Sequence, residues 1–210
     1  MSNVAGGIME IEIPKNVENL QLPDPCLISY FWNIEDRKIW LETELDETWL
    51  EYERMILKWN KEDDGVPVEE RKPIKLFFFS PGGDLDVNNS FCDVLKLSKT
   101  PIIGINMGIC LSGGAFTYLA CHKRYTLPKS TFLLHSGSCD GIGGTAEQIQ
   151  AFTENYKKQT KELKAYLIDE VGLDKKIVNA KMRGEWFIDA QKAVELGVAH
   201  EIVTDISMLL

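Results

Sequence analysis

The chain has 210 residues, of which 44% are hydrophobic, and a formal net charge of −9, so one domain with a substantial core is expected and a general nucleic-acid-binding surface is not. No apolar run reaches the ~18 residues that span a membrane, and five scattered cysteines without a Cys-x-x-Cys pair argue against a disulfide framework or a zinc site. These features predict a cytoplasmic protein with reduced thiols and no membrane, nucleic-acid or metal partner.

The N-terminal part of the chain predicts short strands. Residues 9–13 alternate apolar and acidic side chains, which is typical of a strand. Residues 26–32 and 37–42 predict two further strands with a polar turn between them. Because prolines separate residues 1–24 from the strand at 26–32, we expect an N-terminal arm and then a single domain over residues 25–210.

A helix and a charged loop are expected next. The helix begins at Asp46, and Trp49, Ile56 and Trp59 recur along it at helical spacing, which predicts an aromatic stripe facing the core. Residues 60–73 are charged and contain prolines and a glycine, so they predict a loop in solvent. This loop is longer than the usual connection of ~4–6 residues.

The rest of the chain alternates strands with helices. The expected strands are 74–80, 101–107, 125–127, 131–134 and 199–203. The expected helices are 86–96, 115–121, 145–171, 175–180, which Asp174 caps, and 190–196, which Asp189 caps. Repeated strand–helix units indicate an α/β protein with a largely parallel sheet.

The helix over 145–171 is unusual in length. Thr145 to Gln148 form a capping box at its start, and Gly172 follows its end. A helix of ~26 residues is nearly 40 Å long at about 1.5 Å per residue. Because it is also highly charged, we expect it to protrude or to pack against another subunit.

Three strand ends carry residues with catalytic potential. Ser112 lies on a small-residue turn between a strand and a helix, Gly82–Gly83 follow a second strand, and His135 ends a third. The carboxyl ends of parallel strands converge at one edge of a sheet. A serine, a histidine base and backbone N–H donors together would form an acyl-transfer site. His122 lies in a cationic turn and His200 near the last strand, so His135 is the preferred base.

These motifs carry a family resemblance. Ser-Pro-Gly-Gly, Gly-x-x-x-Ser-x-Gly-Ala and the strand-ending histidine, in this order, resemble the ClpP family, the proteolytic subunit of Clp proteases. The resemblance runs from about residue 26 to residue 203. It implies a ClpP/crotonase-like spiral of strand–helix units, in which helix 145–171 is the handle that joins two rings. It also implies an axial position for residues 1–24, against a flexible arm as the alternative.

The resemblance also implies a third catalytic group. Matching Phe187 to the family's phenylalanine places Glu185 where the family has its catalytic aspartate. The alternatives are Asp189, whose position also suits a helix cap, and a weak or absent third group. A glutamate is one methylene longer, so its backbone would have to lie further from the histidine.

The implied oxyanion donors are the backbone N–H groups of Gly83 and Gly113. Family members commonly have methionine at the position of Gly113, and the role needs no side chain. A second departure follows His135, where Ser136–Gly137 replace the usual Gln-Pro. This change affects the expected shape of the neighbouring subsite.

The resemblance therefore implies a serine endopeptidase without a cofactor. It implies self-association into stacked heptameric rings, an AAA+ unfoldase of the ClpX or ClpA type as partner, and unfolded proteins as substrates. One alternative is a degenerate ring subunit that assembles with an active paralogue. Another is a crotonase-type acyl-CoA enzyme, in which the Gly82–Gly83 and Ser112–Gly113 amides would hold a thioester enolate.

Overall fold

The computed structural model describes residues 32–139 and 141–210. The N-terminal arm, with its predicted strand at 9–13, lies outside these residues, as does nearly all of the strand predicted at 26–32. Trp32, the last residue of that prediction, lies in a short helical segment over residues 32–35. The polar turn expected after it is therefore largely helical.

In the described residues, seven strands form one sheet. Its order is β1-β2-β3-β4-β7, and β5 pairs with both β3 and β6. All pairs are parallel except the antiparallel pair β5–β6. The strands are β1 (Lys38–Leu41), β2 (Ile74–Ser80), β3 (Ile102–Leu111), β4 (Lys123–Thr126), β5 (Thr131–Leu134), β6 (Trp186–Asp189) and β7 (Glu201–Ile202).

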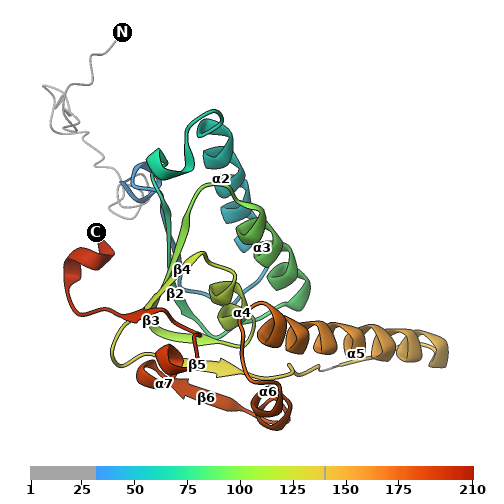
Figure 1. The fold of residues 1–210 in the computed structure, drawn as a ribbon. Coiled ribbons are helices and arrows are strands. Elements are labelled where there is room, and N and C mark those ends of the chain that lie inside the picture. The colour runs from blue at the N-terminus through green and yellow to red at the C-terminus, as the bar shows by residue number, and fades with distance from the viewer. Residues whose placement is uncertain (1–31, 140) are drawn as a thin grey trace, which may run out of the picture.

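Helices follow most of the strands, as the α/β prediction requires. Helices α2 and α3 run beside one another along the sheet, and α5 extends far from the body of the molecule (Figure 1). The helices are α2 (Trp49–Glu62), α3 (Leu85–Leu97), α4 (Gly113–Leu119), α5 (Ala146–Asp169), α6 (Lys175–Lys181) and α7 (Ala190–Glu195), with short 3-10 helices at η2 (Val68–Glu70) and η3 (Ile206–Leu209).

Strand β3 is longer than predicted and divides the sheet. Its first half pairs with β2 and β4, and its last three residues, 109–111, pair with β5. The division occurs at Gly108, where a Cβ atom would lie 2.8 Å from the ring of Phe79. The β2–β3 register shifts at the same level, between Phe78 and Ser80. Because β3 continues to Leu111, the strand itself delivers Ser112 to the edge of the sheet.

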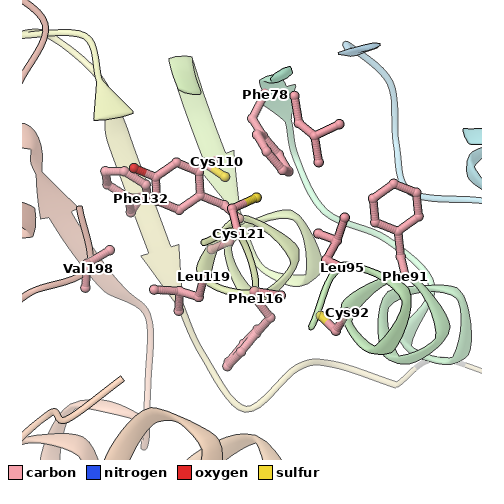
Figure 2. Packing of buried hydrophobic residues seen from close by; sticks show 14 of the residues in the cluster. Phe78, Phe91, Cys92, Leu95, Cys110, Phe116, Leu119, Cys121, Phe132 and Val198 are labelled. Atoms are coloured by element: carbon pink, nitrogen blue, oxygen red, sulfur yellow. The ribbon is translucent and has the colours of Figure 1, made fainter. Parts of the chain in front are cut away.

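The main core lies between the sheet and the helices α2, α3 and α4. Figure 2 shows Phe78 of β2 and Phe132 of β5 facing the side chains of α3 and α4. Alternate residues of β2 supply this face, because successive side chains of a strand point to opposite sides. The aromatic stripe predicted on the first helix is confirmed, since Trp49, Ile56 and Trp59 are buried.

The prediction of a solvent loop over residues 60–73 is partly wrong. Helix α2 continues to Glu62, and Asp63 is only 7% exposed. The Asp63 carboxylate accepts two hydrogen bonds from the Arg37 guanidinium, at 2.7 and 2.9 Å, and one from Thr100 Oγ1 at 2.7 Å. The acidic start of the segment therefore anchors α2 to the end of the α3–β3 connection.

Helix α5 begins as predicted. Thr145 and Gln148 form a reciprocal capping box, and the 24-residue helix ends at Asp169, before Gly172 at φ 82°. Leu167 is its one buried residue. In the described part of the chain, neither α5 nor any other helix is long and apolar enough to cross a membrane.

Candidate active site

The three predicted strand ends meet at one edge of the sheet. Strands β2, β3 and β5 are neighbours and run parallel. The turn of Gly82–Gly83 follows β2, Ser112 follows β3, and His135 follows β5. The structure brings the last two into contact, with Ser112 Oγ 2.6 Å from His135 Nε2. This is the distance at which a histidine can take a proton from a serine hydroxyl.

Ser112 is held in a strained backbone conformation. Its φ and ψ angles are 51° and −127°, which is rare for a residue with a side chain. The Ser112 N–H donates to Leu133 O of the neighbouring strand at 2.9 Å. Gly82 packs against the turn so closely that a Cβ atom there would lie 2.6 Å from both Leu111 O and Ser112 Cβ. Strain of this kind is common at catalytic positions, because it points a side chain out of a sharp turn.

The two expected oxyanion amides lie close together. Gly83 has φ 154° and is clamped by Leu45, which donates to Gly82 O and accepts from Asp84 N, both at 2.8 Å. A Cβ atom on Gly83 would lie 2.2 Å from Leu45 O. A Cβ atom on Gly113 would lie at the ordinary distance of 3.6 Å from Gly83 N. Thus Gly82 and Gly83 are required by their geometry, whereas position 113 has room for a side chain.

Strand β6 places Glu185 beside the histidine. In the antiparallel β5–β6 pair, Trp186 lies opposite Leu134, so Glu185 lies opposite His135. Glu185 Oε1 is 3.3 Å from His135 Nδ1. The Ser112, His135 and Glu185 side chains therefore form a continuous chain of polar contacts.

The alternative carboxylate, Asp189, lies elsewhere. It pairs with Thr131 at the other end of β5, about 13 Å along the strand at ~3.3 Å per residue. Its Oδ1 accepts from Lys192 N at 2.8 Å and caps α7. The predicted cap is confirmed. The sequence reading missed β6 itself, because residues 186–188 are all apolar and show no alternation, and only the structure shows that residues 186–189 are alternately buried and exposed.

The other two histidines face the opposite edge of the sheet. His122 Nδ1 accepts from Ile102 N at the start of β3, and His200 Nδ1 accepts from Arg124 N in β4. Burial lowers the pKa of His122, and burial together with the nearby cation of Arg124 lowers that of His200. Both imidazole rings therefore accept hydrogen bonds from backbone N–H groups at the starts of strands.

The loop after His135 is tied to two helices. Ser136 Oγ donates to Met182 O at 2.7 Å, and Tyr156 OH of α5 donates to Ser136 O at 3.1 Å. Gly137 has φ 84°, and a Cβ atom there would lie 2.8 Å from Tyr156 OH. The sequence reading did not identify Tyr156, because only the packing of α5 brings it to this loop.

A cleft of about 590 Å³ opens over these residues. Phe152, Tyr156 and Leu163 of α5 line it together with Ser112 and His135, and the remaining lining includes Glu44, Asp84 and Asp86. Its volume suits a short stretch of polypeptide or another small ligand. Among the described residues, no group of three or more His, Cys, Asp or Glu side chains is placed to hold a metal ion.

Comparison with known proteins identifies the family. The sequence profile of Clp protease matches residues 34–205. The chain belongs to the Clp protease family. Among curated members, the ATP-dependent Clp protease proteolytic subunit 2 of Treponema pallidum is 31% identical over 134 residues, which cover 63% of this chain and 67% of that protein. The protein of the same name from Pseudomonas aeruginosa is 29% identical over 133 residues, covering 62% and 66%.

A solved Clp protease structure has the same fold. A mutant of ClpP1 from Listeria monocytogenes superposes with a TM-score of 0.72, covering 88% of this chain and 99% of that one, at 18% identity. The predicted ClpP-like α/β fold is therefore confirmed, and this likeness concerns the fold alone. The present chain spans about two thirds of the length of the curated Clp subunits that it matches. Membership of the Clp protease family supports peptide hydrolysis as the chemistry of this protein.

Proposed function

We propose that this Clp protease family member is a serine endopeptidase in which Ser112 is the nucleophile and His135 the general base. The observation that carries the proposal is the contact of 2.6 Å between Ser112 Oγ and His135 Nε2 on a strained turn. A serine hydroxyl is a poor nucleophile without such a base. Glu185, at 3.3 Å from Nδ1, is the orienting carboxylate.

The proposed reaction has two halves. His135 Nε2 accepts the hydroxyl proton as Ser112 Oγ attacks the peptide carbonyl, and the Gly83 and Gly113 amides receive the developing oxyanion. The protonated imidazole then gives its proton to the leaving amine, which breaks the peptide bond. Water, activated by the same imidazole, hydrolyses the acyl-enzyme. Glu185 favours the tautomer with a proton on Nδ1 and stabilises the charged ring.

We further infer a role in ATP-dependent proteolysis, from the names of the relatives and the resemblance of the motifs. Residues 25–210 would form one peptidase domain, and α5 would be the handle between stacked heptameric rings. An AAA+ unfoldase of the ClpX or ClpA type would deliver unfolded polypeptides. Short peptides would be cleaved without that partner, because they need no unfolding.

Labelling with a fluorophosphonate probe tests the nucleophile. The probe phosphonylates an activated serine with release of fluoride, and intact mass counts the adducts. We expect one adduct per chain in the wild-type protein and none in Ser112→Ala. Absence of an adduct on a well-folded, assembled wild-type protein would contradict the proposal and favour the degenerate ring subunit.

A comparison of short peptides with a folded protein as substrates tests the peptidase activity and its dependence on an ATPase partner. The purified chain should cleave short fluorogenic peptides alone, and should degrade a folded protein only with a Clp-family ATPase and ATP. Retention of coenzyme A on the chain, without peptide cleavage, would instead favour the crotonase-type alternative. That chemistry would have no need for the contact between Ser112 and His135.

A further inference from the structure

A buried hydrogen bond joins the two helices that follow the oxyanion amides. Helix α3 begins two residues after Gly83, and α4 begins at Gly113. Thr117 Oγ1 of α4 donates to Asn88 Oδ1 of α3 at 3.1 Å. Asn88 is 1% exposed and Thr117 is fully buried. Burying two polar side chains at this depth costs free energy unless they form a hydrogen bond, so the fold strongly favours the geometry in which Asn88 and Thr117 are bonded.

The Asn88 side chain also lies beside the oxyanion turn. A Cβ atom built on Gly113 would lie 3.6 Å from Asn88 Cβ and 3.6 Å from Gly83 N. Asn88 Cβ and the Gly83 amide therefore both lie on the side of Gly113 where a Cβ atom would stand. We therefore expect a movement of Asn88 relative to α4 to change the separation of the two amides.

The Cys92 thiol of α3 also donates to Asn88 Oδ1 at 3.7 Å and interacts with the Thr117 side chain, and the other contacts between α3 and α4 are apolar. Figure 2 shows Phe116 of α4 with Cys92 and Leu95 of α3 in the main core. Dispersion contacts of this kind fix a distance between helices but have little directional preference. The Asn88–Thr117 hydrogen bond is directional, so it sets how far α3 can slide or rotate against α4.

Space for such a displacement exists on the other side of Asn88. This residue lines a pocket of about 320 Å³ between α3 and α5, together with Cys92 and Lys96. Without the Thr117 hydroxyl, Asn88 Oδ1 keeps only the contact of 3.7 Å with Cys92 Sγ, and we expect the Asn88 amide to turn toward this pocket. Asn88 Nδ2 otherwise has a contact of 3.3 Å with Asn89 Oδ1.

We propose that Asn88 and Thr117 are positioning residues that hold the Gly83 and Gly113 amides at the spacing needed for the oxyanion. The inference rests on the proposed serine peptidase function. Oxyanion donors stabilise the transition state only when they lie about 2.7–3.1 Å from the oxyanion. A small error in their spacing therefore reduces transition-state stabilisation and leaves substrate binding intact. Loss of the bond should therefore lower kcat and leave KM nearly unchanged.

Thr117→Val tests the inference, because valine has the shape of threonine without the hydroxyl. With a fluorogenic peptide, we expect kcat to fall on the order of tenfold and KM to change by less than about twofold. Affinity for a peptide boronic acid, whose tetrahedral adduct on Ser112 occupies the oxyanion position, should fall by the same factor as kcat. Thr117→Ser keeps the hydroxyl and should recover most of kcat.

Thr126→Val is the matched control. Thr126 is also fully buried, and its Oγ1 donates to Leu127 O at 3.3 Å in β4, away from the cleft. We expect Thr126→Val to lower thermal stability about as much as Thr117→Val and to keep the wild-type kcat. Equal kinetics for wild type and Thr117→Val, or equal losses in both valine variants, would overturn the inference. A wild-type protein that the fluorophosphonate fails to label would overturn the proposed function and this inference with it.

Discussion

Glu185 and His135 face one another just beyond the end of the antiparallel β5–β6 ladder, and solvent reaches them very unequally. The Glu185 side chain is 58% exposed and that of His135 is 16% exposed. Water competes for an exposed carboxylate, so its electrostatic effect on the imidazole is reduced. The arrangement favours an orienting role for Glu185 that is weaker than that of a buried aspartate.

Replacing Glu185 should therefore reduce catalysis moderately. Glu185→Gln keeps a hydrogen-bond acceptor for Nδ1 but removes the charge that stabilises the imidazolium. We expect kcat to fall roughly tenfold to a hundredfold, less than the loss of a buried triad aspartate causes. Peptide hydrolysis at saturating substrate measures this change.

Asp189→Asn is the control for that experiment. Asparagine is a good helix cap, so the α7 cap at Lys192 N should persist. We expect wild-type kcat in this variant. A larger loss in Asp189→Asn than in Glu185→Gln would reverse the assignment of the third group.

Ser136→Ala should loosen the segment that carries Glu185. The Ser136 hydroxyl ties the end of β5 to Met182 O, three residues before Glu185. Its loss should lower kcat roughly three- to tenfold. In a Glu185→Gln background the same change should have little further effect, because both act on His135. Additive losses in the double variant would show that Ser136 acts by another route.

The glycines of the site should differ in their tolerance of a methyl group. Gly82→Ala combines φ 92° with a Cβ atom 2.6 Å from Leu111 O, and we expect a loss of about 3 kcal/mol or more in the free energy of unfolding. Gly113→Ala meets no atom within 3.4 Å, so its thermal unfolding should match that of the wild-type protein. Similar unfolding midpoints for the two variants would contradict the described turn.

The ion pair of Arg37 with Asp63 should make stability depend on acid pH. Hydrogen bonding to Arg37 holds the pKa of Asp63 below its ordinary value of 3.8, despite burial. The ionised carboxylate therefore stabilises the fold at neutral pH, and this contribution is lost as the pH falls through the lowered pKa. Asp63→Asn should cost about 3 kcal/mol at about pH 7 and less at about pH 3, as measured by urea unfolding.

Asp36→Asn controls for a surface carboxylate. Asp36 also contacts cations, Lys38 and Lys72, but its side chain is 52% exposed. We expect a change of about 0.5 kcal/mol or less. Equal effects of the two substitutions would show that the burial of Asp63 is energetically unimportant.

Much of the fold was predictable because its signals are local. The apolar run of β2, the capping box of α5 and the aspartate caps at Asp174 and Asp189 are each legible within a few residues. The convergence of Ser112 and His135 followed from one added rule, that parallel strand ends meet at one edge.

The errors involve contacts between distant residues. Asp63 looked like a loop carboxylate, since the sequence does not reveal that Arg37 and Thr100 lie beside it. Strand β6 was missed because Trp-Phe-Ile-Asp is short and has no apolar–polar alternation, and its pairing with β5 is not visible in the sequence. The bond between Asn88 and Thr117 joins residues 29 apart and has no sequence signature.

Helix α5 has a consequence for how this subunit exchanges hydrogen with solvent. Leu167, near its C-terminal end, is its one buried residue, and Ile149 and Phe152 are 40% and 43% exposed. Its first turns therefore depend on the Thr145 capping box and on whatever surface covers them. Amide protons there should exchange rapidly in a separated subunit and slowly once another chain packs on the helix. Deuterium uptake along α5 would thus report whether the subunit is assembled.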